Sequence, residues 1–251
     1  MTRLLLLDVG NSRLKWALAV DGRLGRQRAL PIGARGALPV AALCAALPKR
    51  IDGVRIVSVA APRATRRLAQ ALRRATGVQP RVLHTAAQAG GVRCGYDEPW
   101  RLGADRWAAV IGAHHLHTPA RAICVVDVGT AMTVDYVSPG GRHGGGAIVP
   151  GPALMVASLL GGTQGIQVRA APRADTGRAL FARGTHAAIV QGAHYAAAAF
   201  IERALHEARR RHGGRPELVL TGGGAAGLLP YLQVPCRIVP DLVLRGLLAL
   251  G

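Results

Sequence analysis

Two copies of an Asp-Val-Gly turn are the first residues in this sequence whose types and spacing could do chemistry. Asp8-Val9-Gly10-Asn11 and Asp127-Val128-Gly129-Thr130 lie 119 residues apart, each after a continuous apolar run. An Asp at the end of a buried strand places a carboxylate at the rim of a sheet, and glycine lets a phosphate approach the turn amides. Asn11 and Ser12 add donors, and Lys15 could reach a phosphate as a point charge. The pair suggests a two-sided phosphate clamp, although each turn alone is also ordinary hairpin chemistry.

A third glycine-rich turn supports a nucleotide site. Thr221-Gly222-Gly223-Gly224 follows a predicted strand, residues 217–220, and leads into a predicted helix. A strand, a glycine loop and a helix in this order suit a phosphate or adenosine at a helix N-terminus. The three glycines could instead form a flexible connection. The sequence has no GxxxxGK[ST] motif and no GxGxxG after its first strand, which disfavours P-loop and Rossmann proteins.

An acidic and aromatic segment, residues 95–107, is the other candidate for chemistry. Pro99 discourages a helix before it, whereas residues 107–113 have a helical pattern, so residues 103–106 should lie at a helix start. Asp105 is then either a helix N-cap or a carboxylate directed into a cleft. Arg106 beside it would suit a carboxylate or phosphate on a substrate.

The elements that must position these residues are also repeated. Strands are predicted over residues 4–7, 14–20 and 28–30 in the first half, with a turn at Asp21-Gly22. In the second half they are predicted over residues 123–126, 132–137 and 144–149, with a turn at 139–141. Each half therefore opens with a three-stranded meander whose first strand ends in Asp-Val-Gly.

Helices and strands are predicted to alternate after each meander. The first half has helix 37–47, strand 54–59, helix 63–76 and strand 81–84; the second has helix 186–211, strand 217–220, helix 225–231, strand 237–239 and a closing helix. Because no linker is evident, we predict two tightly packed halves, residues 1–117 and 118–251, around a cleft. The predicted fold class is α/β, with a mixed sheet flanked by helices in each half.

Composition narrows the class of protein. Half of the 251 residues are hydrophobic, which excludes a mainly disordered chain, and no apolar run approaches the roughly 18 residues of a membrane-spanning helix. The cysteines are far apart and include no CxxC pair, which argues against a zinc site or a disulfide framework; they are Cys44, Cys94, Cys124 and Cys236. We therefore expect a cytoplasmic protein without a membrane partner.

The net charge of +19 suggests a polyanionic partner such as a nucleotide, a nucleic acid or a membrane surface. The arginines are nevertheless dispersed, and those of residues 63–74 border an apolar stripe, which indicates a solvated helix face. Three histidines, His114, His115 and His117, follow a predicted helix near its C-terminal end, where electrostatics favours His. This position explains the cluster better than a metal site does.

In combination, these motifs resemble the type III pantothenate kinase family of the sugar kinase/actin-like ATPase superfamily. The residues that carry the resemblance are 8–15, Tyr96, 103–107, 127–130 and 145–151. The matches run in order from residue 8 to about residue 224, which is nearly the whole chain. The resemblance implies duplicated RNase H-like/actin-like ATPase domains. It also implies ATP-dependent phosphorylation of the 4′-hydroxyl of pantothenate, the first step of coenzyme A biosynthesis. Some members were first named as transcription accessory factors, so a nucleic-acid-associated role remains the alternative, although a nucleic acid partner is not expected.

The same resemblance assigns roles to individual residues. The first ATP phosphate loop comprises Asp8, Val9, Gly10, Asn11, Ser12, Arg13, Leu14 and Lys15, with Asp8 near the Mg²⁺ of the nucleotide and Thr130 as a further ATP contact. Asp105 is implied to be the general base, and pantothenate is implied to bind Tyr96, Gly103, Ala104, Asp105, Arg106 and Thr185. Asp127 is implied to ligate a monovalent cation, K⁺ or NH₄⁺.

The sequence differs from the family pattern at two places, and the resemblance also implies a homodimer. Gly184 stands where the family has Asn, and the segment after Gly161 lacks the Leu-Pro of the family. Both departures concern the surroundings of Thr185 more than the nucleotide site. The family generally forms homodimers with the substrate site near the subunit interface, and the apolar face of residues 187–200 is the expected contact.

Overall fold

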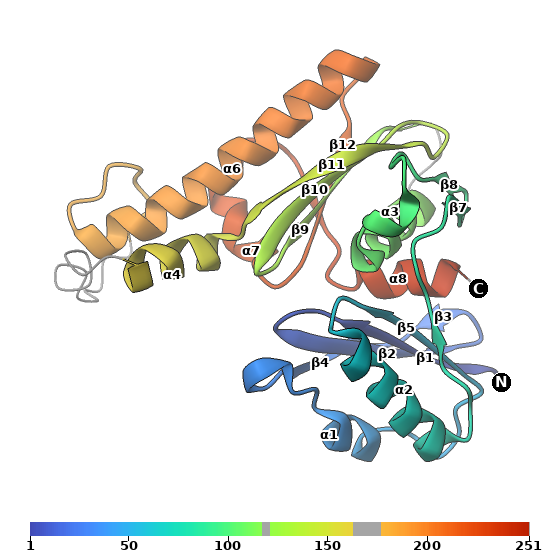
Figure 1. The fold of residues 1–251 in the computed structure, drawn as a ribbon. Helices are drawn as coiled ribbons and strands as arrows, with labels where there is room; N and C mark the ends of the chain where they lie inside the picture. Colours follow the sequence, from blue (N-terminus) through green and yellow to red (C-terminus); the bar gives the residue numbers. More distant parts are fainter. Residues whose placement is uncertain (117–120, 163–176, 251) are drawn as a thin grey trace. The chain divides into compact units, whose positions relative to one another are not determined.

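The computed structural model describes residues 1–116, 121–162 and 177–250, which form two mixed β-sheets and the helices that cover them (Figure 1). They pack as two compact units. Unit 1 holds Met1–Ala120, Pro139–Gly145 and Asp241–Gly251, and unit 2 holds Arg121–Ser138 and Gly146–Pro240. The division into duplicated halves at 117/118 follows the sequence repeat, whereas these units are discontinuous in sequence, so that division stays a prediction.

The sheet of unit 1 has the order β3-β2-β1-β5-β6, with β4 also paired to β2. Its strands are β1 (Arg3–Val9), β2 (Arg13–Val20), β3 (Arg23–Leu24), β4 (Arg28–Pro31), β5 (Gly53–Ser58) and β6 (Arg81–Val82). Strand β1 is antiparallel to β2 and parallel to β5. The turn between β2 and β3 has positive φ at Asp21 and Gly22, as a tight hairpin turn requires.

The second sheet repeats this arrangement. Its order is β11-β10-β9-β12-β13, with strands β9 (Ile123–Val128), β10 (Ala131–Val137), β11 (His143–Pro150), β12 (Glu217–Thr221) and β13 (Arg237–Ile238). Strand β9 is antiparallel to β10 and parallel to β12, as β1 is to β2 and β5. The structure thus confirms a three-stranded meander at the start of each half, followed by two parallel strands.

Helices cover both faces of the first sheet. They are α1 (Val40–Ala45), α2 (Pro62–Thr76), α3 (Ala104–Leu116) and α8 (Leu242–Ala249), with short 3₁₀ turns at Ala34–Gly36 and Pro99–Arg101. Alternate residues of β1 and β2 pack against α1 and α2, which lie on the same side of the sheet (Figure 1). Helix α2 buries Leu68 and Leu72 and exposes its arginines, which confirms the expected solvated face. Helices α3 and α8 pack on each other and on the sheet.

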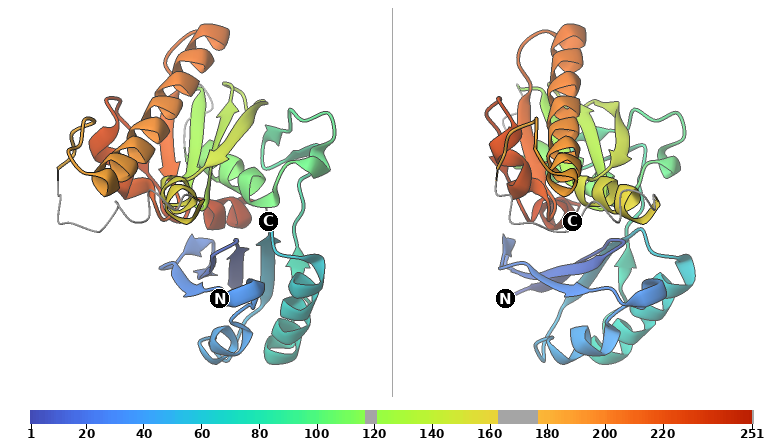
Figure 2. Two further views of the ribbon diagram at one scale, coloured as in Figure 1. Left: turned by 60° about the vertical axis from the view of Figure 1, so that its left-hand side comes forward. Right: turned by 90° about the vertical axis from the view of Figure 1, so that its left-hand side faces the viewer.

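Helix α6 (Thr185–His212) covers one face of the second sheet, and α4 (Pro152–Gly162) lies beside its N-terminal turns (Figure 2). The core of this unit joins Ala197, Ile201 and Ala208 of α6 to Cys124, Val126 and Val128 of β9. Helix α7 (Ala225–Leu228) and the 3₁₀ turn η3 (Leu229–Tyr231) follow β12. No helix in the described ranges is long and apolar enough to span a bilayer.

Three elements differ from the sequence-based expectation for understandable reasons. Helix α1 is shorter than the predicted helix 37–47. It begins after Pro39, and residues 46–47 form a turn instead of continuing the helix. The hairpin of β7 (Gln88–Ala89) and β8 (Val92–Arg93) has strands of two residues, too short to show a period. Helix α4 is apolar on all sides, so it has no amphipathic pattern by which it could be recognised.

Candidate functional site

The first Asp-Val-Gly turn joins β1 to β2 and places a buried carboxylate beside an ammonium. Asp8, which is 5% exposed, lies opposite Lys15 in the ladder, and its Oδ2 is 3.6 Å from Nζ of Lys15. The amide of Gly10 donates to the carbonyl of Arg13, which closes the turn. Residues 11–13 are exposed, whereas the side chains of Val9 and Leu14 are fully buried in the core. Within the predicted phosphate loop, Val9 and Leu14 can therefore offer a nucleotide only their backbone.

The second turn joins β9 to β10 and is one residue shorter. Three residues separate Val128 from its ladder partner Met132, compared with four between Val9 and Leu14. Asp127 is half-buried and lies opposite Thr133, so the cross-strand position that holds Lys15 in the first copy is neutral here. The exposed Thr130 forms the tip of this turn, and its carbonyl accepts a hydrogen bond from the amide of Gly151 at 2.9 Å.

The third glycine-rich turn packs directly against Asp127. Thr221, the last residue of β12, pairs with Asp127 of β9. Gly222 follows with φ of +89°, and a Cβ at this position would lie 2.3 Å from Oδ1 of Asp127 and 2.5 Å from the carbonyl oxygen of Val128. The amide of Gly224 donates to that same carbonyl at 2.9 Å. Glycine is thus required at 222, and the turn is fixed onto the second Asp-Val-Gly copy rather than being a flexible connection.

The acidic and aromatic segment leads into α3. Gly103 precedes the helix and its carbonyl accepts a hydrogen bond from Trp107, and Ala104 is the first helical residue. Asp105 is the second, and its Oδ1 accepts a hydrogen bond from the amide of Arg106 at 2.8 Å. Asp105 is therefore not the N-cap. The positive end of the α3 dipole nevertheless favours its ionised form.

Arg106 and Tyr96 meet in unit 1. The Arg106 side chain is almost fully buried, donates from Nη1 to the Tyr96 hydroxyl at 3.1 Å and lies 5.8 Å from the centre of its ring. The ring of the buried His143 stacks on Tyr96 at 5.9 Å. Gly95 allows this stacking, because a Cβ there would lie 2.0 Å from the carbonyl oxygen of His143. Sequence reasoning missed His143, since nothing in the residues around it signals a ring contact with Tyr96.

Thr185 is the first residue of α6, with Gly184 as the N-cap. Glycine is tolerated at an N-cap almost as well as Asn, so the departure at 184 leaves the helix start intact. The apolar residues that follow do not form one free face: Ala187, Ala193, Ala197 and Ala198 are buried within unit 2. Residues 187–200 were predicted to contact a second subunit. Only the outward-facing residues of this run are free to do so.

The described histidines of α3 and the thiol of Cys124 form neither a metal site nor a nucleophilic centre. Among the described residues, no three His, Cys, Asp or Glu side chains gather as a metal site would require. His114 and His115 lie at the end of α3, where Nε2 of His115 is 3.0 Å from the carbonyl oxygen of Gly90, and His117 lies outside the described residues. Burial raises the pKa of the Cys124 thiol to about 12, with a further contribution from Asp135, so this thiol is not a nucleophile.

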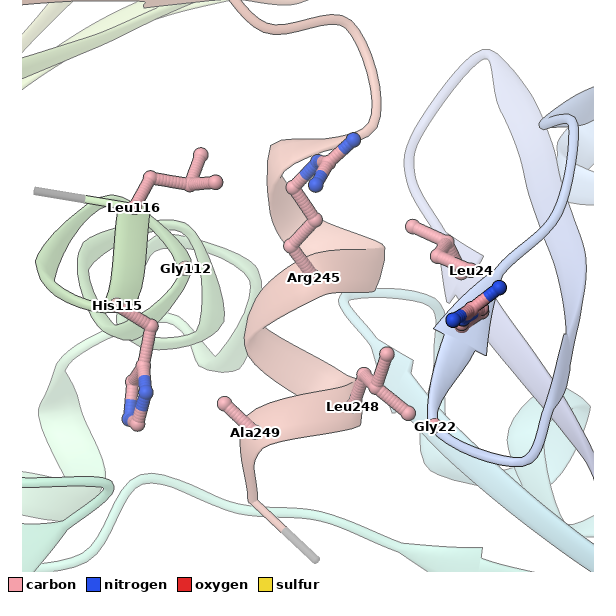
Figure 3. A pocket seen from close by; sticks show the side chains of 9 residues that line it. Gly22, Leu24, Gly112, His115, Leu116, Arg245, Leu248 and Ala249 are labelled. Carbon is pink, nitrogen blue, oxygen red and sulfur yellow. The ribbon is translucent and has the colours of Figure 1, made fainter.

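A hollow of about 430 Å³ in unit 1 lies apart from the predicted site residues. It is formed over α8 by the end of α3 and the β2–β3 turn, with Leu116 and His115 on one side of Arg245 and Leu24 on the other (Figure 3). Nε of Arg245 donates at 2.8 Å to Oδ1 of Asp241, the N-cap residue of α8. None of the candidate catalytic or binding residues lines this hollow.

Comparisons with known proteins agree with the motifs. The family model described as type III pantothenate kinase matches residues 4–207. Proteins named type III pantothenate kinase include one from Halorhodospira halophila, 40% identical over 97% of this chain and 96% of its own length. Another, from Nitrosococcus oceani, is 36% identical over 97% of this chain and 92% of its own length.

Solved structures show the same fold. A conserved protein from Campylobacter jejuni, named as a Baf family transcriptional activator, is 19% identical and covers 96% of this chain and 94% of its own, with a TM-score of 0.60. A ROK family glucokinase from Streptomyces griseus, in complex with glucose and AMPPNP, is 12% identical over 99% of each chain, with a TM-score of 0.50. These likenesses confirm the predicted duplicated actin-like ATPase fold. At such identities they say nothing of activity, and the accessory-factor alternative is not favoured.

Proposed function

The chain belongs to the type III pantothenate kinase family, and on this premise we propose how its residues perform the reaction of a pantothenate kinase. The reaction transfers a phosphoryl group from ATP to the 4′-hydroxyl of pantothenate, the first step of coenzyme A biosynthesis. Phosphoryl transfer depends mainly on positioning and on neutralising charge. The residues of the site would therefore act mainly by positioning the reactants and by neutralising charge, without forming a covalent intermediate.

We assign the ATP phosphates to the two Asp-Val-Gly turns. In the first, the exposed residues 11–13 and the Lys15 ammonium would face the phosphates, since the Gly10 amide already donates to the Arg13 carbonyl. In the second, Thr130 would contribute its hydroxyl. The position of the Gly222 turn directly against Asp127 supports a third nucleotide contact there. Backbone amides in tight turns are suited to phosphate oxygens because they donate without the cost of ordering a side chain.

Two cations fit the two aspartates differently. Mg²⁺ keeps several waters and binds phosphate oxygens, so one well-placed carboxylate suffices, and the buried Asp8 would supply it. A monovalent ion is large and weakly hydrated, and suits one carboxylate plus carbonyl oxygens. The Val128 carbonyl lies beside the same glycine turn as the Asp127 carboxylate, and the two would be ligands for such an ion. When bound, the cations would offset the negative charge that develops during transfer.

Asp105 is the proposed general base, and the observation that carries this assignment is the Asp105–Arg106–Tyr96 arrangement at the start of α3. Arg106 is almost fully buried and its Nη1 donates to the Tyr96 hydroxyl at 3.1 Å, so a fixed positive charge and a phenol lie at the helix start that carries Asp105. Together with Gly103, Ala104 and Thr185, these two side chains would hold pantothenate, and Asp105 would accept the proton of its hydroxyl.

Coupled ATP turnover with and without pantothenate, at several K⁺ concentrations, tests this function. We expect turnover only with pantothenate present and only with a monovalent cation of suitable size. ATP turnover that is independent of pantothenate would indicate an ATPase of the same fold and would reject the substrate assignment.

We also propose that the chain is a cytoplasmic homodimer whose interface is formed by α4 and the outward face of α6. Residues 152–162 and 185–201 contain no Asp, Glu, Lys or Arg, although the chain carries a net charge of +19. Helix α4 buries only Pro152 and exposes Leu154 and Leu159 by about two-fifths. A second copy of such a basic chain would be repelled from most faces, so this uncharged, apolar face is the one suited to self-association.

Light scattering tests the assembly. We expect twice the 26.1 kDa chain mass for the wild type and a monomer for the double variant Leu154→Glu/Leu159→Glu. Leu229→Glu, at a similarly exposed leucine in η3 rather than in α4 or α6, should remain dimeric. A monomeric wild type at micromolar concentration would reject the homodimer.

A further inference from the structure

Two side chains of α6 hold the chain at Gly177 and Arg178, eight and seven residues before Thr185. Nε2 of Gln191 donates to the carbonyl oxygen of Gly177 at 2.5 Å, and the hydroxyl of Tyr195 donates to the carbonyl oxygen of Arg178 at 3.0 Å. Residues 177–184 form no regular secondary structure of their own. These two hydrogen bonds therefore restrain the segment that enters α6 at Thr185.

Tyr231 determines how Gln191 is oriented. Its hydroxyl donates to Oε1 of Gln191 at 2.8 Å, and Gln191 is only 5% exposed. The amide group must present its NH₂ to the Gly177 carbonyl, because two carbonyl oxygens would repel each other. Its oxygen then faces Tyr231, which supplies the donor that this oxygen requires. Without the Tyr231 hydroxyl, the buried amide oxygen would lose this partner.

Two ring contacts fix Tyr231 itself. Its ring stacks on His194 at 4.9 Å with an interplanar angle of 22° and meets Tyr195 edge to face at 5.1 Å. Nδ1 of His194 is 2.8 Å from the carbonyl oxygen of Val190, and since a carbonyl only accepts, Nδ1 carries the proton. The His194 ring is thereby held in place on α6, and it holds the Tyr231 ring in turn.

Tyr231 also stands close in sequence to the proposed nucleotide turn. It is the last residue of η3, which follows α7, and α7 begins directly after Gly224. All of these residues belong to unit 2. The network thus joins the chain that follows the Gly222–Gly224 turn to the chain that precedes Thr185.

We propose that Tyr231, acting through Gln191, is a positioning residue for the pantothenate site, because it holds Gly177 at the start of the segment that leads to Thr185. The inference rests on the proposed contact of Thr185 with pantothenate. Tyr231 has no role in the chemistry of transfer, so its removal affects substrate binding and not the rate of the bound complex.

Steady-state kinetics of Tyr231→Phe test this role, since the variant removes one hydroxyl and keeps both ring contacts. A neutral hydrogen bond contributes about three- to tenfold in an equilibrium constant, so we expect the KM for pantothenate to rise by about that factor. The kcat and the KM for ATP should stay within about twofold of the wild type. Tyr136→Phe, the same change in β10, is the control and should alter none of these constants. An equal loss in kcat, or an unchanged KM for pantothenate, would overturn the proposal.

A double-variant cycle shows whether Tyr231 acts through Gln191. Gln191→Met keeps the length of the side chain and removes both hydrogen bonds. If the two residues act in series, Tyr231→Phe should add little to the KM of the Gln191→Met variant. Effects that multiply in the double variant would show that Tyr231 acts by another route.

Limited trypsin digestion measures directly how strongly residues 177–184 are restrained, whether or not Thr185 contacts pantothenate. Cleavage between Arg178 and Ala179, detected as a fragment beginning at Ala179, should be about three- to tenfold faster in Tyr231→Phe than in the wild type or in Tyr136→Phe. Unchanged cleavage would show that Tyr231 does not restrain the segment.

Thr185→Val separates failure of the inference from failure of the proposed function. If Thr185→Val raises the KM for pantothenate but Tyr231→Phe does not, the substrate assignment stands and the positioning role is wrong. If Thr185→Val leaves this KM unchanged, the proposed substrate contact is wrong and the positioning role is rejected with it. The rate of cleavage after Arg178 would then still show whether Tyr231 restrains the segment.

Discussion

The ammonium of Lys15 lies 3.6 Å from the carboxylate of Asp8, its direct partner across the β1–β2 ladder. Asp127 has the same place in the repeat, but its partner across the β9–β10 ladder is the uncharged Thr133. The two aspartates therefore have different electrostatic surroundings, although the repeat makes them equivalent in sequence. This difference provides a physical basis for giving them different ions.

We predict that Asp8→Asn and Asp127→Asn differ in their ion dependence. Asp8→Asn should reduce turnover at every K⁺ concentration, because the carboxylate proposed for the Mg²⁺ of the nucleotide is lost. Asp127→Asn should mainly raise the K⁺ concentration needed for activity, by about tenfold, equal to about 1.4 kcal/mol, and weaken substrate binding. Titrating K⁺ at saturating Mg²⁺, and then Mg²⁺ at saturating K⁺, separates the two. The same ion dependence in both variants would show that the aspartates share one role.

Asp105→Asn should reduce turnover by about 100-fold or more, the usual loss when a positioned base is removed. The amide keeps the size of the side chain and its hydrogen bond to the Arg106 amide but does not accept the substrate proton. Binding of a fluorescent ATP analogue should be nearly unchanged. Asp97→Asn is the matched control, since Asp97 is an exposed carboxylate of the same segment, and its turnover should equal that of the wild type. Normal phosphorylation of pantothenate by Asp105→Asn would leave Asp105 with only a helix-start role.

Gly222→Ala should destabilise the protein by more than about 1 kcal/mol and abolish most activity. Its Cβ would lie 2.3 Å from the Asp127 carboxylate, and its φ of +89° is strained for any other residue. Gly223→Ala is the control, because its Cβ would meet nothing within 4 Å and its φ is not positive. Thermal unfolding and turnover of both variants check this prediction. Equal stability of the two would mean that the turn adjusts without disturbing Asp127.

His114 should make folding stability depend on pH. Burial lowers the pKa of its imidazole, with a smaller contribution from His115. The unfolded state then binds more protons below its own pKa of about 6.5, so the stability contribution is complete above that pH and is lost as the pH falls from there towards the lowered native pKa. The denaturation midpoint should therefore fall between pH 7.5 and 5.5, and fall less in His114→Phe. The same substitution at the exposed His206 is the control, and a drop as large in His114→Phe as in the wild type would contradict the assignment.

The repeat and the order of the elements could be predicted from local residue patterns. Asp-Val-Gly after an apolar run specifies a buried strand and a tight turn through local preferences alone, so β1, β2, β9 and β10 were predictable. The periodic residues of α2 and α6 likewise indicated their helices. The motifs also identified the family, because their residue types are set by the chemistry of phosphate and hydroxyl groups.

Which distant residues come into contact depends on tertiary packing. Neither the stacking of His143 on Tyr96 nor the approach of Gly222 to Asp127 has a signature in the sequence, because each joins elements that are far apart along the chain. The Tyr231–Gln191–Gly177 network is of the same kind. The burial of Val9 and Leu14 within a predicted phosphate loop also depends on packing. Local propensity fixes the elements, whereas the contacts between side chains depend on how sheets and helices pack, which no short window of sequence contains.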